Sequence, residues 1–188
     1  LGYYGYESGH YVERLPDTVD HDIKLETLSL GLYGWAVITS HKKKTTQLIT
    51  SPWCPPEDVA DLINRFTSAC DDVLVKHDLN EAQPFRLETP FTSNMTKTEY
   101  AQKFSSVQDY IRSGDCYQVN LAQRFSTKYQ GDTFTAYHTL RDACPTPFSA
   151  YMEFSPQQSL LSHSPERFLL CDQGRVESKP IKGTVARG

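Results

Sequence analysis

Lys182 lies in the segment Lys179-Pro180-Ile181-Lys182-Gly183-Thr184, near the end of the 188-residue sequence. Proline fixes one backbone angle and glycine lets a ligand approach the backbone closely, so the segment has the parts of a small-molecule site. A lysine acts as a covalent nucleophile only as the neutral amine, which requires desolvation or a neighbouring positive charge. Lys182 is therefore a candidate nucleophile, and the alternative is an ordinary solvated lysine.

A carboxyl group, Glu166, lies sixteen residues upstream in the segment Ser164-Pro165-Glu166-Arg167-Phe168. The apolar run 168–171, the turn 172–175 and the return segment 176–179 together predict an antiparallel hairpin. Such a hairpin brings Glu166 and Lys182 to the same end, where an acid and a nucleophile could act on one substrate. The alternative is a surface salt bridge, which contributes only about 0–1 kcal/mol.

The segment 113–125, SGDCYQVNLAQRF, has the alternation of a strand. With a period of two, Tyr117, Val119 and Leu121 share one face, and the amides of Gln118 and Asn120 share the other. Amides on the less apolar face could hydrogen-bond a polar ligand without adding a charge. Amides that are satisfied within a sheet would give the same pattern.

The first half of the sequence contains two predicted elements that follow an irregular start through Pro16. The apolar stretches 28–39 and 45–51 predict a hairpin, whose first strand is apolar enough to be central in a sheet. Residues 55–58, two prolines followed by two acids, suit the first turn of a helix that should pack on this sheet.

The second half follows a linker predicted over residues 80–91. Thr96 and Glu99 form a capping box for a helix that ends at Gly114, and its apolar stripe should face the core. Residues 132–143 predict a third helix, and residues 147–154 and 159–162 begin the next strands. The stripe of the second helix consists of Tyr100, Phe104, Val107 and Ile111.

Composition argues against several classes of function. The formal net charge is −4 and no stripe of lysine and arginine is present, which disfavours nucleic-acid binding. No stretch has the ~20 apolar residues of a membrane span, and the first residues lack a signal-peptide pattern, so we expect a cytoplasmic protein. The five cysteines show no paired short spacing, which disfavours a zinc site or a redox pair.

The sequence closely resembles the aminodeoxychorismate synthase component I family, also called para-aminobenzoate synthase component I. Three segments carry this resemblance through their residues, order and spacing: 113–125, 164–168 (SPERF) and 180–184 (PIKGT). This family belongs to the chorismate-utilising enzymes, which include anthranilate and isochorismate synthases. The resemblance extends back to residues 5–7 and 30–36, so it covers essentially the whole chain. It implies an α+β fold, namely a truncated part of the anthranilate synthase component I-like fold, with a largely antiparallel sheet and packed helices.

The resemblance implies conversion of chorismate and ammonia to 4-amino-4-deoxychorismate for para-aminobenzoate and folate synthesis, with ammonia supplied by a glutaminase partner, component II. By this analogy Lys182 attacks ring carbon C2 while the 4-hydroxyl leaves, and ammonia then enters at C4 and expels the lysine. Glu166 matches the general acid that protonates the departing hydroxyl. Gln118 stands where isochorismate synthases have a water-activating lysine, and an amide cannot deprotonate water.

The same analogy assigns further contacts. Gln118, Gly183 and Thr184 are predicted to bind substrate, and anthranilate synthases usually have alanine where this sequence has Lys182. The residues Pro147, Phe148 and Ser149 match part of a pocket that binds tryptophan as an effector in relatives, so they form a candidate tryptophan site.

The resemblance also predicts what the chain comprises. We expect a central portion of the catalytic component, in which residues 1–91 end an N-terminal region and residues 92–188 begin the chorismate-binding domain. Family members need Mg²⁺ held by glutamates in a C-terminal half, and we expect no metal ligands in this chain. We therefore expect the chain to be inactive alone and able to dimerise through exposed sheet edges. The alternatives are an anthranilate synthase-like enzyme and a non-catalytic fragment that binds a partner.

Overall fold

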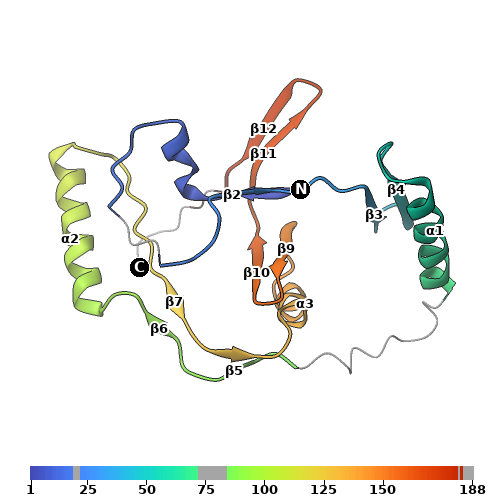
Figure 1. Cartoon of the computed structure of the whole chain (residues 1–188). Helices are drawn as coiled ribbons and strands as arrows, with labels where there is room; N and C mark the ends of the chain where they lie inside the picture. The colour runs from blue at the N-terminus through green and yellow to red at the C-terminus, as the bar shows by residue number, and fades with distance from the viewer. Residues whose placement is uncertain (19–21, 72–83, 182, 184–188) are drawn as a thin grey trace. The chain divides into compact units, whose positions relative to one another are not determined.

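The structure is a computed structural model that describes residues 1–18, 22–71, 84–181 and 183 (Figure 1). The chain divides into two compact units, residues 1–77 and 78–188. This division precedes the boundary expected at residues 91 and 92, and the expected assignment of the two parts to domains stays a prediction.

The first unit contains two antiparallel strand pairs. Strand β1 (Gly2–Tyr4) pairs with β2 (Leu28–Leu30), and the 3-10 helix η1 (Tyr6–Tyr11) follows β1, so the start of the chain is more regular than predicted. Strand β3 (Trp35–Ser40) pairs with β4 (Thr45–Thr50) in the predicted hairpin. The predicted strand 28–39 is divided at residues 31–34, where two glycines weaken a continuous strand.

Helix α1 (Pro56–Asp71) begins where the prolines and acids predicted it, with Glu57 and Asp58 in its first turn. Leu62 is the buried apolar residue of the described part of this unit, and α1 contacts β4. Ile63 is 51% exposed. The helix therefore packs on the hairpin through a narrower face than its apolar spacing predicts.

The second unit begins with two short strand pairs. Strands β5 (Arg86–Leu87) and β8 (Tyr129–Gln130) pair with each other, as do β6 (Thr92–Ser93) and β7 (Phe125–Ser126). The described end of the predicted linker thus contains a strand, β5. Between β6 and β7 lies helix α2 (Lys97–Ser113).

Helix α2 has the predicted ends but not the predicted burial. The Thr96 hydroxyl accepts a hydrogen bond from the Glu99 N–H at 3.2 Å, the Glu99 carboxylate accepts one from the Thr96 N–H at 2.7 Å, and Gly114 ends the helix at a φ of 84°. No residue of α2 is buried in the described structure, and Phe104 of the apolar stripe is 49% exposed. The prediction of a core face is therefore wrong here, because no described element covers the stripe.

The predicted strand over residues 113–125 is also wrong, apart from Phe125 at its end. Residues 115–124 pair with no other described strand, and Tyr117 is 93% exposed. Alternating residues favour an extended backbone, but a strand needs a partner for its N–H and C=O groups.

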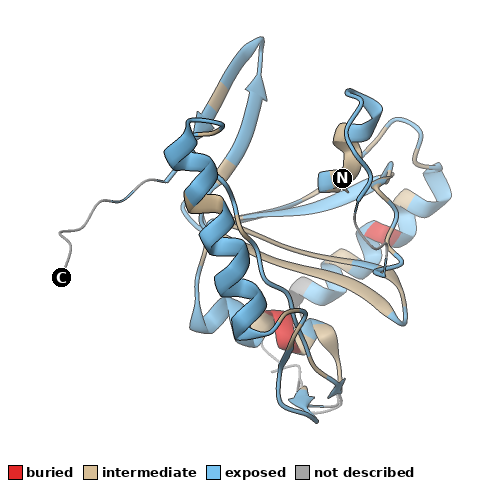
Figure 2. Ribbon diagram, turned by 90° about the vertical axis from the view of Figure 1, so that its left-hand side faces the viewer, coloured by how far each residue is buried: buried red, intermediate tan, exposed pale blue. Residues whose placement is uncertain are grey.

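The best-packed part of the second unit is a helix on a long strand pair. Helix α3 (Thr133–Ala143) contacts both β9 (Phe148–Ser155) and β10 (Gln158–Ser164), and these strands pair in antiparallel register. Ala136 and Tyr137 of α3 are the buried apolar residues of the described part of this unit (Figure 2). The hairpin of β11 (Arg167–Asp172) and β12 (Arg175–Lys179) then ends the regular structure of the described residues.

Candidate functional site

The predicted hairpin around Glu166 is confirmed as β11 and β12. Its turn follows Asp172, which pairs with Arg175, and both Gln173 and Gly174 have positive φ, at 47° and 77°. At the other end of the hairpin Arg167 is paired with Lys179. Glu166 therefore lies directly before the open end of the hairpin, as the sequence predicted.

Glu166 is exposed, but its backbone is fixed. Its N–H donates to the Ser164 hydroxyl at 3.2 Å, and the same hydroxyl donates to the Glu166 carbonyl oxygen at 3.1 Å. Ser164 ends β10, so this local turn joins the long strand pair to the hairpin. An exposed carboxyl group on a fixed backbone is accessible to a ligand.

Two of the predicted site residues, Lys182 and Thr184, lie outside the described residues. The convergence of Lys182 with Glu166 therefore stays a prediction. Gly183 is described, and no heavy atom beyond its chain neighbours lies within 4 Å of the position that a Cβ would take. The backbone at Gly183 is thus open to a ligand.

Three charged residues form an ion network at the open end of the hairpin, which we call the hairpin network: Arg167, Glu177 and Lys179. The Arg167 guanidinium donates to Glu177 Oε1 at 2.6 Å, and Lys179 Nζ lies 3.1 Å from the same oxygen. The Lys179 hydrogen bond and the nearby Arg167 charge lower the pKa of Glu177, so this residue is a carboxylate at neutral pH. Sequence reasoning missed the network, although alternation along the return strand could have shown that Glu177 and Lys179 share a face.

Arg167 also contacts the long strand pair. Its guanidinium lies over the ring of Phe148 of β9, 5.4 Å from the ring centroid. A cation over an aromatic face is stabilising, more so when both are partly shielded from water. Arg167 is therefore held by a carboxylate and by a ring at the same time.

Gln118 lies in the segment 115–124, outside the described strands, and is exposed. In the described structure its side chain makes no hydrogen bond that would link it to Glu166. The structure thus does not bring Gln118 together with the hairpin, and its predicted role in binding substrate stays a prediction.

The candidate tryptophan site lies at the start of β9. Phe148 contacts Arg167, and the Ser149 hydroxyl lies 2.6 Å from Thr146 Oγ1 and 3.5 Å from His163 Nδ1. Pro147 directly precedes these residues. Two of the three predicted side chains are thus engaged in contacts within the protein, and tryptophan binding stays a prediction.

His163 belongs to an aromatic cluster between α3 and the long strand pair. Its ring centroid lies 5.2 Å from that of Tyr137, which in turn lies 5.7 Å from Tyr151. The Tyr151 hydroxyl bonds Thr133 Oγ1 at 3.0 Å. These contacts give His163 a structural role.

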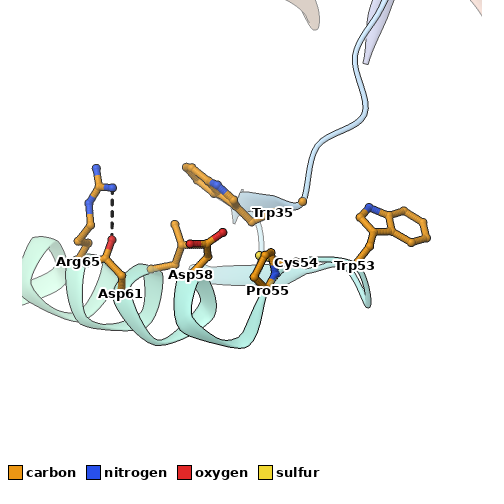
Figure 3. A pocket seen from close by; sticks show the side chains of 9 residues that line it. Trp35, Trp53, Cys54, Pro55, Asp58, Asp61 and Arg65 are labelled. Carbon is orange, nitrogen blue, oxygen red and sulfur yellow. Dashed lines mark ion pairs between the residues drawn. The ribbon is translucent and has the colours of Figure 1, made fainter.

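A hollow lies in the first unit, beside the start of α1 (Figure 3). It has a volume of about 460 Å³, and Trp35 and Trp53 lie on its wall with Asp61 and Arg65, which form an ion pair at 3.7 Å. None of the predicted site residues lines it. Because both ionic groups are exposed, the pair contributes little and indicates no chemistry.

The described residues contain no group of three or more histidine, cysteine, aspartate or glutamate side chains that could hold a metal ion. That this chain has no ligands for the Mg²⁺ of the family stays a prediction. Among the same residues, no helix has the length and apolar character needed to cross a membrane.

Comparisons with known proteins agree with the resemblance. The chain is 40% identical over 187 residues to aminodeoxychorismate synthase component 1 of Escherichia coli and 41% identical to that of Salmonella typhimurium. Each alignment covers 100% of this chain and 38% of the relative, so the chain spans about two fifths of the length of these curated relatives. Anthranilate synthase component 1 1 of Haloarcula marismortui is 30% identical over 100% of this chain and 40% of its own length.

A solved structure shows the fold. Anthranilate synthase component I from Streptococcus pneumoniae matches with a TM-score of 0.80 and 20% identity, over 94% of this chain and 40% of that chain. The antiparallel strand pairs with helices therefore form part of a known α+β fold. A family model described as chorismate binding enzyme matches residues 1–188, and the chain belongs to this family.

Proposed function

We propose that this chain is part of an aminodeoxychorismate synthase component 1, which makes 4-amino-4-deoxychorismate from chorismate and ammonia. The observation that carries the proposal is the identity over the whole chain. It is 37–41% to three proteins of that name and 30% to a fourth, whereas three anthranilate synthases that match the whole chain are 25–30% identical. Lys182 supports the same assignment, because anthranilate synthases usually have alanine there.

The proposed chemistry uses two side chains. Glu166 gives its proton to the 4-hydroxyl of chorismate, which leaves as water, while the Lys182 amine forms a bond to C2. Ammonia then bonds to C4 as the C2–lysine bond breaks, so Lys182 leaves as the neutral amine, and the new ammonium group at C4 returns a proton to the Glu166 carboxylate. The exposed carboxyl group of Glu166 on its fixed backbone supports the first step, since a general acid must reach the leaving oxygen.

Gly183 and Thr184 are proposed to bind chorismate beside Lys182, and Gln118 is proposed to bind it from the segment 115–124. The open space at Gly183 supports a close approach of the ligand to the backbone. A glutaminase component is the proposed source of ammonia, and the designation component 1 of the relatives is consistent with such a partner.

We further propose that residues 1–188 alone do not turn over chorismate. The support is physical: the large apolar side chains of the described part are mostly exposed, including Trp35, Tyr117 and Phe168. A site held by so little packing is not kept in the geometry that catalysis needs. Self-association through these apolar surfaces, giving a dimer, is proposed for the same reason.

The decisive experiment is a product assay with chorismate, ammonium and Mg²⁺. It uses residues 1–188 alone and the same residues within a full-length protein whose remainder comes from the Escherichia coli relative. We expect the full-length protein to form 4-amino-4-deoxychorismate, Lys182→Ala to abolish product formation and Glu166→Gln to slow it at least about 100-fold. Anthranilate as the product would instead support the second candidate, an anthranilate synthase-like enzyme, which the 30% identity to the Haloarcula marismortui protein favours. The absence of any product from the full-length protein would overturn the proposal and favour a partner-binding fragment.

A further inference from the structure

Glu166 is fixed on its N-terminal side by Ser164, but the position of its carboxyl group also depends on the residues that follow. The next residue, Arg167, opens the hairpin and is paired with Lys179. Leu170 is three residues after Arg167 in β11, but their partners in β12, Glu177 and Lys179, are only two residues apart. This irregularity is a β-bulge, which bends a strand and redirects its side chains.

Little apolar packing holds the hairpin in place. Phe168 is 88% exposed, Leu169 57% and Val176 63%, so the hairpin buries few of its large apolar side chains. Within this unit the hairpin extends away from β10 (Figure 1). The orientation of the hairpin therefore depends strongly on two contacts, that of Arg167 with Phe148 and that of Ser164 with Glu166.

The charges at the open end require compensation. Arg167 and Lys179 are direct partners across the hairpin, and like charges in this position repel each other. Glu177 offsets this repulsion, because one of its oxygens bonds both cations. The side chains of Arg167 and Glu177 are 28% and 33% exposed, so water screens this pair less than an ordinary surface pair.

We propose that Glu177, acting through Arg167, positions Glu166 for proton transfer to the substrate. The inference rests on the proposed function, and Glu177 is a positioning residue that does not touch the substrate itself. Loss of the Glu177 carboxylate releases Arg167 from one of its two anchors and leaves two cations facing each other. The Glu166 carboxyl group then samples positions away from the leaving oxygen.

The test is steady-state kinetics on the full-length protein that contains residues 1–188. We expect Glu177→Ala to lower kcat about tenfold with KM within about twofold, because small displacements of a catalytic group cost rate and leave ground-state binding intact. Glu177→Gln keeps a hydrogen-bond acceptor and should recover part of the rate. The matched control is Asp172→Ala, which removes a carboxylate from the other end of the same hairpin and should leave kcat unchanged.

A double-mutant cycle separates positioning from a general loss of structure. Arg167→Met keeps an apolar side chain against Phe148 and removes the charge. If Glu177 acts through Arg167, the Arg167→Met, Glu177→Ala double variant has the kcat of the worse single variant. The inference would be overturned if the losses in kcat of the two single variants add in the double variant. It would also be overturned by a kcat for Glu177→Ala within twofold of the wild type, or by parallel changes in kcat, KM and melting temperature.

A second measurement distinguishes this inference from the proposed function. If the wild type forms no product, the proposed function fails, and hydrogen exchange of a peptide covering residues 163–170 still tests the positioning. We expect faster exchange in Glu177→Ala and wild-type exchange in Asp172→Ala. Equal exchange in all three proteins would show that Glu177 does not hold the segment around Glu166.

Discussion

At the scale of single residues, the proposed chemistry depends on an amine and a carboxyl group that the chain separates by a hairpin. Glu166 has an exposed side chain and a backbone fixed by Ser164, which is suitable for an acid that meets its substrate from solution. The hairpin network adds a second constraint on Glu166, from its C-terminal side. The acid is thus held by neighbours that do not themselves need to touch chorismate.

The nucleophile can be tested directly by mass spectrometry. Incubation of the full-length protein with chorismate in the absence of ammonia should give a covalent adduct with the mass of chorismate less one water, because Lys182 bonds to C2 as the hydroxyl leaves. Tryptic mapping should place the adduct on the peptide that contains Lys182. Lys179→Ala is the matched control, since it removes a nearby lysine and should keep the adduct. An adduct that persists in Lys182→Ala would contradict the role of Lys182.

The acid can be tested by substitution. Glu166→Gln keeps the size of the side chain and removes the transferable proton, so kcat should fall by about 100- to 10,000-fold, the usual contribution of general acid catalysis. KM for chorismate should change little. Glu153→Gln, a change in an exposed carboxylate of β9, is the control and should keep the wild-type rate. A fall of less than about tenfold in Glu166→Gln would remove the residue from the mechanism.

At the scale of elements, the features that sequence predicted well are those that neighbouring residues decide. The Thr96 and Glu99 capping box, the Gly114 end of α2 and the turn at Gly174 each depend on a few adjacent residues, and all three are confirmed. The strand predicted over 113–125 and the buried stripe of α2 depend instead on a partner element, and no described element supplies one. The hairpin network escaped prediction because it joins two strands through side chains that ordinarily lie in water.

Helix α3 allows a test of local capping. The Asp132 carboxylate accepts hydrogen bonds from the Thr135 N–H at 2.7 Å and from its hydroxyl at 2.8 Å. Asp132→Ala should therefore lower the free energy of unfolding by about 1 kcal/mol, the usual value of such a cap. Asp142→Ala, near the other end of α3, should change it by less than about 0.5 kcal/mol. Urea denaturation followed by circular dichroism measures both, and equal effects would argue against the cap.

The same cap predicts a dependence on pH. Partial burial opposes ionisation of Asp132, but the hydrogen bonds from Thr135 outweigh it and hold the pKa below the ordinary value of 3.8. Because the pKa of Asp132 is lower in the folded state, its ionisation stabilises the folded protein at pH values above the pKa of the unfolded state. This stabilisation is lost as the pH falls through 3.8 towards the pKa of the folded state. The Asp132→Ala variant should lack this part of the acid transition. An identical acid transition in the variant would contradict the assignment.

At the scale of the whole molecule, few of the residues that the structure describes are buried, and each unit has its own. Tyr137, at 9% exposure, packs between Phe134, Tyr151 and His163, whereas Tyr117 is 93% exposed. The family match over the whole chain shows that it belongs to the family described as chorismate binding enzyme. The sequence predicted the family through three short segments, but it could not predict which apolar faces would remain uncovered, because cover depends on elements distant in the chain.

The exposed apolar faces predict association. Residues Trp35, Val37, Ile38 and Ile49 of the β3–β4 hairpin are each about half exposed, and Phe104 and Ile111 of α2 are partly so. Apolar surface of this kind drives association, so residues 1–188 should show a sedimentation coefficient that rises with concentration. Substitution of exposed residues should weaken it, and Val37→Thr with Ile49→Thr keeps β-branched side chains while reducing apolar area. The control pair Thr39→Ser and Thr46→Ser lies on the same hairpin and should not weaken association.

Within the full-length protein the concentration dependence should disappear if the same faces are covered there. A monomer at all concentrations for residues 1–188 would show that these faces do not associate, and the proposed dimer would then be wrong.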